Sequence, residues 1–395
     1  MPKMTWTKPS KVNIPLHNPT TKYYDLLVNI GDTVIVGQPI AHRYATDLKI
    51  PVFASISGTL KEIKSMEVIN GIQMDHAVIE NDYEFKRIER SKLTRRSAKE
   101  LRDHITKMGI GGQYQNGMQT PLAFDESIKH VVINAVYQNQ AFTKESAAVL
   151  DDSYPKIIAG AALLGQASDA PVTILTNQQE LKSLAEQEGL SVQWVKPVAH
   201  KAWEYQALKA IAKQKVPFNP LEIGLLFTTS SVAKAVYDAV EEGMPYTQVE
   251  VHLLSDYDFT MIDVPIGTSI SDVLGQLNKT TDSTDQWFSG SVLYGSPYKT
   301  DQFVVSDQAF DIGVTKNVIT EDVCIKCGLC NDACPVGILP QNIMDAEIRE
   351  VEDRIYDYKV DQCVECGLCS YVCPSEINVL EWQRRAKRRV ARGVE

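Results

Sequence analysis

No cysteine occurs in the first 323 residues of this 395-residue chain. That gap excludes a disulfide framework and thiol catalysis from most of the protein. Long apolar runs are also missing, because nothing approaches the roughly 18 apolar residues of a membrane-spanning helix. The N-terminal stretch MPKMTWTKPSKVNIPLHNP lacks the apolar core and small-residue cleavage site of a secretory signal. We therefore expect a cytoplasmic protein.

Basic charge is scarce outside the last few residues. The formal charge is -10, and the final stretch QRRAKRRVARGVE alone carries +5, which leaves -15 for residues 1–382. Such an acidic body excludes nucleic acid as a partner. The tail is expected to form a helix whose cations either make a solvated face or steer an acidic redox partner or an anionic membrane surface. Its basic residues are Arg384, Arg385, Lys387, Arg388, Arg389 and Arg392.

Paired histidine ligands are missing as well. The seven histidines form no H-x-x-x-H pair and have no cysteine near them, so we interpret each as a surface or core residue. What the chain does have is eight cysteines confined to two short runs. Clustered cysteines in a large, reduced, cytosolic chain are typical of a metal site.

The two runs share one spacing, C-x2-C-x2-C-x3-C followed by proline. This is the pattern of bacterial two-cluster ferredoxins, in which the fourth cysteine of each run binds the other cluster. It predicts one [4Fe-4S] cluster on Cys324, Cys327, Cys330 and Cys373, and a second on Cys363, Cys366, Cys369 and Cys334. Gly328 and Gly367 are expected at the tight turns around the clusters. The alternative is a pair of structural zinc sites, which the repeated Cys-Pro endings make a poor match.

The sequence around these runs predicts helices. Ile343, Ile348, Val351 and Ile355 recur at helical spacing between the runs, and Val379, Trp382, Ala386 and Val390 form one apolar stripe after them. Residues 316–395 are therefore expected to form a helical 2[4Fe-4S] ferredoxin domain with a basic C-terminal helix.

Residues 1–90 are predicted to form a compact β domain. Short alternating strands separated by Gly-Asp, Ser-Gly and Asn-Gly turns indicate hairpins. GDTVIVGQPI followed by PVFASISGTL resembles the barrel-sandwich hybrid of biotinyl and lipoyl carriers. A carrier needs a modifiable lysine at a hairpin tip, and Lys49 is the one candidate. Its setting, TDLKIPV, favours a scaffold.

Strands alternate with helices over residues 97–256. Predicted strands cover 130–136, 171–176, 192–195, 222–227 and 248–254, with helices such as NQQELKSLAEQEG and SVAKAVYDAVEEG between them. This pattern indicates an α/β domain with a largely parallel sheet, whose ligand sites would follow Ala135 and Phe227. Residues 257–315 are predicted as a third unit of strands with a short helix capped by Ser269 or Ser271.

The order of these four parts, with PIGTSISDVLGQL, SGSVLYGSP, ILPQNI and CSYVCPSEI, resembles the RnfC family over the whole chain. That family is the peripheral subunit of a membrane complex that couples ferredoxin and NAD redox chemistry to ion transport. The resemblance implies that residues 257–315 are an SLBB-like β-grasp domain. It also implies that the α/β domain is similar to the flavin subunit of respiratory complex I, with sites for FMN and NADH.

Three segments depart from the family at the implied flavin site. The glycine-rich loop, roughly G-I-V-G-x-G-G-A-x-F-P-T, is MGIGGQYQNGMQTPLAF here and keeps only Gly109, Gly111 and Gly112. The acidic N-x-x-E-C-E-P loop becomes NAVYQNQAF, so that Asn134 alone remains, and a GGE segment becomes WEYQALKAIAKQ. These losses imply that FMN and NADH binding is weakened or abandoned.

The sequence therefore predicts an iron-sulfur protein that relays single electrons to or from a larger oxidoreductase. Its expected partners are a redox protein or the subunits of a membrane electron-transport complex, on whose cytoplasmic face it would be peripheral. Two alternatives remain within this class: an FMN-dependent NADH dehydrogenase subunit of an Rnf-type complex, and an electron carrier for a cobalamin or amino-acid reductase. A third, from the binding class, is a biotinyl-like carrier that uses Lys49.

Overall fold

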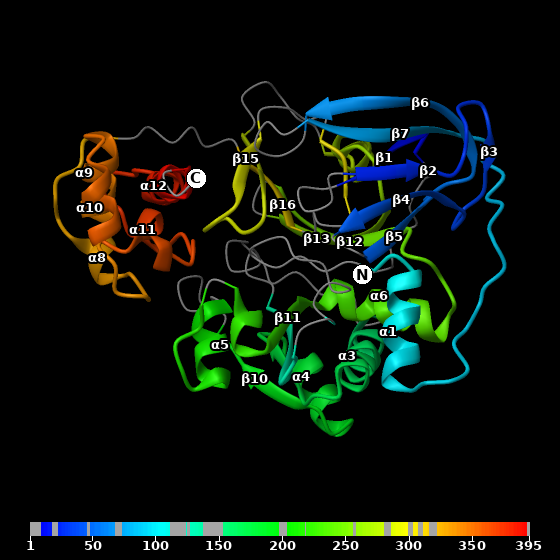
Figure 1. The fold of residues 1–395 in the computed structure, drawn as a ribbon, viewed down its shortest axis with the longest axis horizontal. Coiled ribbons are helices and arrows are strands. Elements are labelled where there is room, and N and C mark those ends of the chain that lie inside the picture. The colour runs from blue at the N-terminus through cyan, green and yellow to red at the C-terminus, as the bar shows by residue number, and fades with distance from the viewer. Residues whose placement is uncertain are drawn as a thin grey trace.

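The chain folds into a barrel of strands, a parallel α/β layer, a central mixed sheet and a helical module at one end (Figure 1). The computed structural model describes residues 9–17, 23–45, 48–67, 73–110, 124, 127–136, 153–196, 204–217, 219–255, 258–279, 286–298, 303–306, 311–315 and 322–392. Within these ranges no helix is long and apolar enough to span a bilayer.

The described part of the barrel is built from strands, in two antiparallel sheets that pack their apolar faces together. One sheet has the order β1-β7-β6-β3 and the other β2-β4-β5. Ile14, Ile40, Leu60 and Ile79 are fully buried between them. The predicted β domain is therefore confirmed. Its strands are β1 (Lys11–Pro15), β2 (Tyr23–Leu26), β3 (Thr33–Val34), β4 (Pro39–Ala45), β5 (Leu48–Phe53), β6 (Gly58–Glu67) and β7 (Gln73–Asn81).

The α/β layer is built on a four-stranded sheet of order β10-β9-β8-β11, in which every described pairing is parallel as predicted. Its strands are β8 (His130–Ala135), β9 (Val172–Thr176), β10 (Ser191–Trp194) and β11 (Leu225–Thr229). Its helices are α1 (Ala98–Lys107), α3 (Tyr154–Ser168), α4 (Gln179–Gln187), α5 (Glu204–Ala212) and α6 (Ser230–Glu241). The strand expected at 222–227 begins later, because Asn219 and Pro220 start a 3-10 turn, η4 (Pro220–Ile223).

The central sheet corrects one predicted boundary. Its order is β13-β12-β16-β14-β15, and it includes β12 (Gln248–Ser255), which the sequence pattern places in the α/β domain. β12 pairs antiparallel with β13 (Asp258–Pro265) over its whole length, from Gln248 opposite Pro265 to Ser255 opposite Asp258. Because β12 pairs with β13, it belongs to the third unit although it follows the α/β elements in the chain. The third unit therefore begins at or before residue 248.

The other elements that the structure describes in the central unit are β14 (Gln286–Ser289), β15 (Ser296–Tyr298), β16 (Asp311–Thr315) and the helix α7 (Ile270–Gln276). Ser269 caps that helix, since its hydroxyl accepts the Asp272 N–H at 3.1 Å. Of the two predicted caps, Ser269 is therefore the correct one.

Residues 322–392 contain helices and no strand. The elements are α8 (Leu329–Asp332), α9 (Pro340–Ile348), α10 (Glu352–Asp357), η5 (Val360–Gln362), α11 (Leu368–Tyr371) and α12 (Val379–Arg392). The single helix predicted between the cysteine runs is in fact two. Glu350 adopts the left-handed conformation and the Val351 N–H returns to the Ala346 carbonyl, which ends α9 in a Schellman-type turn.

The break in this helix changes which side chains are buried. Ile343 and Ile355 lie in the module's core, whereas Ile348 and Val351 are exposed. The apolar stripe predicted for the C-terminal helix is confirmed at two of its positions, because Val379 and Ala386 are buried in α12.

Candidate functional site

The two cysteine runs fold into the same local structure. A left-handed glycine precedes a one-turn helix in each, with Gly328 (φ 79°) before α8 and Gly367 (φ 76°) before α11. Equivalent positions on either side are also left-handed: Lys326, Glu365, Gly337 and Glu376. The two runs therefore share their backbone conformation as well as their cysteine spacing. Both carry their first three thiols on the same type of loop.

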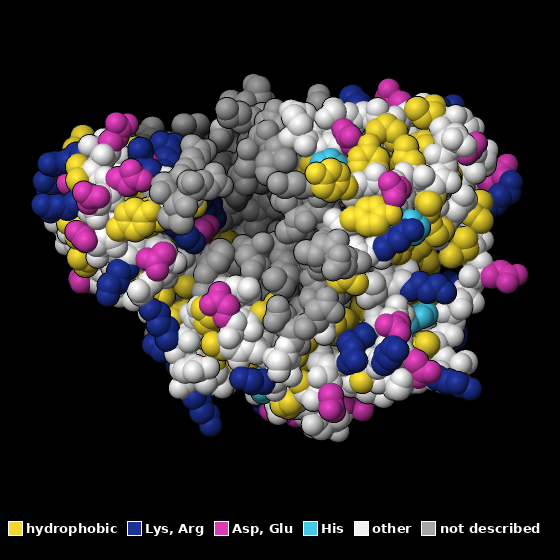
Figure 2. Space-filling view, in the orientation of Figure 1, with side chains coloured by type: hydrophobic (Ala, Val, Ile, Leu, Met, Phe, Trp, Pro, Cys, Tyr) yellow, Lys and Arg dark blue, Asp and Glu magenta, His cyan; other side chains and the backbone are white. Residues whose placement is uncertain are grey.

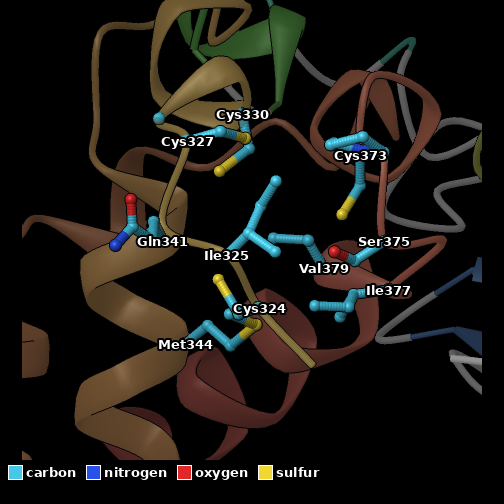
Figure 3. A pocket seen from close by; sticks show the side chains of 12 residues that line it. Cys324, Ile325, Cys327, Cys330, Gln341, Met344, Cys373, Ser375, Ile377 and Val379 are labelled. Atoms are coloured by element: carbon cyan, nitrogen blue, oxygen red, sulfur yellow. The ribbon is translucent and has the colours of Figure 1, made fainter. Parts of the chain in front are cut away.

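The outer group consists of Cys324, Cys327, Cys330 and Cys373, which line one hollow. Figure 3 shows these four side chains around a common space, with Cys373 reaching it from the second run. The hollow measures about 330 Å3, including space open to solvent. Cys327 is exposed and the other three are half-buried, so this group lies near the surface.

The inner group consists of Cys363, Cys366, Cys369 and Cys334, and its first three members are buried. Burial raises the pKa of the Cys363 thiol to about 11 and that of Cys366 to about 12, and the nearby Cys334 contributes to both shifts. The fourth cysteine of the first run is thus a neighbour of the second run. Metal-free thiols of this kind stay protonated at neutral pH, so metal binding must release their protons.

The inner group faces the rest of the protein. Cys366 belongs to the continuous apolar core that also contains the α/β layer and the central sheet. Tyr205 of α5 is buried and close enough to Cys334 to interact electrostatically. Lys215 donates to the Gln362 amide oxygen at 2.6 Å, next to the run. The helical module therefore adjoins α5 on the side of the inner cysteines (Figure 1).

The donor set favours iron-sulfur clusters over mononuclear zinc. All eight candidate ligands are thiols, and a tetrahedral zinc ion would require four of them about 2.3 Å from one centre. The four outer thiols surround one hollow, which suits a polynuclear centre.

The basic tail is largely occupied by contacts inside the module. Five of its six cations form ion pairs there, and the Arg392 side chain lies outside the described residues. Figure 2 shows Lys and Arg side chains next to Asp and Glu over this module. The pairs are Arg384–Glu365 (3.0 Å), Lys387–Glu365 (2.8 Å), Arg389–Glu347 (2.8 Å), Arg385–Glu381 (3.3 Å) and Arg388–Glu381 (2.8 Å). These contacts give the tail a structural role that neither sequence interpretation included.

The residues left from the implied flavin site have structural contacts where they are described. Gly109 follows α1 with φ 72°, and a β-carbon there would lie 2.8 Å from the Phe53 ring. Asn134 is the penultimate residue of β8, and its side-chain oxygen accepts the Val136 N–H at 3.1 Å. Gly111 and Gly112 lie outside the described residues, as does the loop after Val136.

Lys49 lies inside a strand. It belongs to β5, where it pairs with Tyr44 of β4, and its side chain is exposed. The carrier hypothesis placed this lysine at a hairpin tip, whereas the structure places it beside the tip, within the ladder.

Family comparisons match both ends of the chain. Residues 2–84 match the family described as the RnfC barrel sandwich hybrid domain, and residues 317–377 match a 4Fe-4S dicluster domain. The second match covers all eight cysteines and agrees with two [4Fe-4S] clusters.

Curated relatives extend the similarity over most of the chain. The C subunit of the ion-translocating oxidoreductase complex of Vibrio cholerae is 26% identical over 360 residues, which are 85% of this chain and 46% of the relative. The protein of the same name from Klebsiella pneumoniae is 25% identical over 85% of this chain and 47% of its own. That from Buchnera aphidicola is 24% identical over 80% and 71%. The chain thus spans about half the length of the first two.

Among solved structures, an NAD+-reducing [NiFe]-hydrogenase in the H2-reduced state is similar with a TM-score of 0.47 and 10% identity, over 74% of this chain and 60% of that one. The N-terminal domain, the paired cysteine runs and the similarity to the Vibrio cholerae relative across 85% of the sequence agree with one another. The chain is therefore similar to members of the RnfC family over most of its length, and its N-terminal domain matches that family's barrel sandwich hybrid domain.

Proposed function

We propose that this protein relays single electrons through two [4Fe-4S] clusters. The outer group, Cys324, Cys327, Cys330 and Cys373, would hold one cluster, and the inner group, Cys363, Cys366, Cys369 and Cys334, the other. One observation carries the proposal: Cys373 lines the hollow of the first run, and Cys334 lies beside the second. Crossed ligation brings two clusters side by side, as a relay requires.

When bound, each cluster supplies a site that gains or loses one electron. The chain's own residues determine the surroundings of that site. Val364 and Leu368 exclude water from the inner group, while the exposed Cys327 leaves the outer group near solvent. Gly328 and Gly367 hold the loops in a left-handed turn. Backbone N–H groups of these loops would donate to the sulfur of a bound cluster. The exposed outer site suits electron exchange with a partner. The enclosed inner site suits holding an electron within the protein.

We further propose that the protein acts with the subunits of a membrane electron-transport complex, peripherally on its cytoplasmic face. The name of its relatives, which are components of an ion-translocating oxidoreductase complex, supports this assignment. The domains would be a barrel-sandwich hybrid at 1–90, an α/β domain similar to the complex I flavin subunit from 97 to about 247, an SLBB-like β-grasp domain from about 248 to 315, and the ferredoxin domain at 316–395. The altered flavin motifs favour a relay without its own NADH dehydrogenase activity.

Anaerobic purification with iron, acid-labile sulfide, zinc and flavin measured together tests the proposal. We expect about eight irons and eight sulfides per chain, from two cubane clusters. Stoichiometric zinc with little iron after attempted reconstitution would refute it. Tight FMN at near-equal stoichiometry, with rapid NADH-dependent reduction of a viologen dye, would instead establish the dehydrogenase alternative.

A further inference from the structure

Two cations of helix α12 reach the loop that carries the inner cysteines. Lys387 donates to the Cys363 carbonyl oxygen at 3.0 Å and to Glu365 at 2.8 Å. Arg384 donates to the other oxygen of Glu365 at 3.0 Å and to the Tyr294 carbonyl oxygen at 2.7 Å. Glu365 lies between two of the expected ligands, Cys363 and Cys366. The three charged side chains therefore tie α12, the inner loop and the central unit together.

These contacts are enclosed. The side chains of Arg384, Lys387 and Glu365 are only 17%, 20% and 24% exposed. The equivalent position in the outer loop is Lys326, which has the same left-handed backbone but an exposed side chain. The two cysteine groups thus share a backbone and differ in the charges placed beside them.

We propose that Lys387 and Arg384 are positioning residues for the inner cluster and that their charge favours its reduced state. This inference rests on the proposed relay. Glu365 with its two cations carries one net positive charge, and reduction adds one negative charge to the neighbouring cluster. Charges shielded from solvent interact more strongly than exposed ones, and nearby charge is one of the factors that set a cluster's potential.

The sign of the effect can be tested in both directions. Replacing Lys387 with methionine removes a cation, so the inner cluster should become harder to reduce. Replacing Glu365 with glutamine removes the anion and leaves both cations, so it should become easier to reduce. Arg388 provides a matched control, because it lies on the same helix but pairs with Glu381 and is 55% exposed.

The experiment is a redox titration of the full-length, anaerobically reconstituted protein, followed by electron paramagnetic resonance. The inner signal is identified as the one that Cys334→Ala alters. We expect K387M to shift the inner half-reduction point negatively by roughly tenfold in the reduction equilibrium, about 59 mV for one electron. E365Q should shift it positively, and R388M should leave it unchanged. The outer signal should stay constant in all three variants.

Unchanged inner potentials in loaded K387M and E365Q, or shifts of the same sign, would overturn the inference. If K387M does not retain the inner cluster, E365Q still tests the effect of charge. Retention in Lys387→Arg would then support the positioning role, and equal loss in Lys387→Arg would refute it. A wild-type protein that binds no iron would refute the proposed function itself, which is a distinct result.

Discussion

Gly367 meets the backbone of Leu293 so closely that a β-carbon at position 367 would lie 1.7 Å from the Leu293 carbonyl oxygen. Among the described residues, apart from the adjacent ones in the chain, no atom lies within 4 Å of the corresponding point at Gly328. The helical module is therefore held to the central unit by a direct backbone approach on the side of the inner cysteines. The Arg384 contact to Tyr294, one residue along, reinforces the same interface.

This difference predicts unequal effects of Gly367→Ala and Gly328→Ala. Both substitutions force alanine into a left-handed conformation, at a cost of about 1–2 kcal/mol. Only Gly367→Ala must also displace the Leu293 backbone. We expect G367A to lower the thermal unfolding midpoint further and to expose the module to limited proteolysis. Equal destabilisation of the two variants would show that the approach to Leu293 contributes nothing.

Local patterns predict most of the elements well, because hydrophobic periodicity is encoded within short segments, whereas the assignment of the cysteines to two clusters stays a prediction. The same patterns place strand β12 in the wrong sheet, since its pairing with β13 is decided by tertiary structure. They miss the pairing of the basic tail for a similar reason. Arg384 and Glu365 are 19 positions apart, and no local pattern indicates that α12 packs beside the inner loop.

A buried charge network links the α/β layer to the central sheet. Lys234 of α6 contacts Glu250 of β12 at 3.0 Å and Asp263 of β13 at 2.6 Å. His252 then joins Glu250 to Asp311 of β16, at 3.3 and 3.0 Å. Burial alone would raise the pKa of Glu250, but Lys234 and His252 hold it well below its usual range. The network keeps its charges by pairing them.

Lys234→Met should destabilise the protein strongly, because it leaves Glu250 buried without its main counter-ion. Breaking a buried pair costs about 3–5 kcal/mol. The control is Lys182→Met, which breaks an exposed i,i+4 pair with Glu186 worth about 0.3–0.5 kcal/mol. Chemical denaturation of both variants measures the two free energies of unfolding. A loss for Lys234→Met no larger than that of the control would contradict this role.

The same network predicts how stability changes with pH. Burial would lower the pKa of His252, but its hydrogen bonds to Asp311 and Glu250 outweigh burial and raise it to about 9. Because the pKa is higher in the folded protein, protonated His252 contributes its full stabilisation below about pH 6.5, the usual pKa of histidine in an unfolded chain. This contribution is lost as the pH rises through about 9. Wild-type stability should fall across that range by up to about 1.4 kcal/mol per pH unit. The His252→Gln variant should be less stable than the wild type at pH 6, and its free energy of unfolding should change less with pH. If the stability curves of the two proteins run parallel, His252 does not cause this pH dependence.

Crossed ligation predicts that a single cysteine of the first run controls the cluster of the second. Cys334 follows Cys330 in sequence, yet its thiol lies near Cys363 and Cys366. Cys334→Ala should therefore damage chiefly the inner cluster, lowering iron from about eight toward about four per chain. Cys373→Ala is the matched control, because Cys373 lines the outer hollow and its loss should damage chiefly the outer cluster. Iron analysis with electron paramagnetic resonance on both variants separates the two signals. If Cys334→Ala instead removes the same signal as Cys327→Ala, each run holds its own cluster and the crossed assignment is wrong.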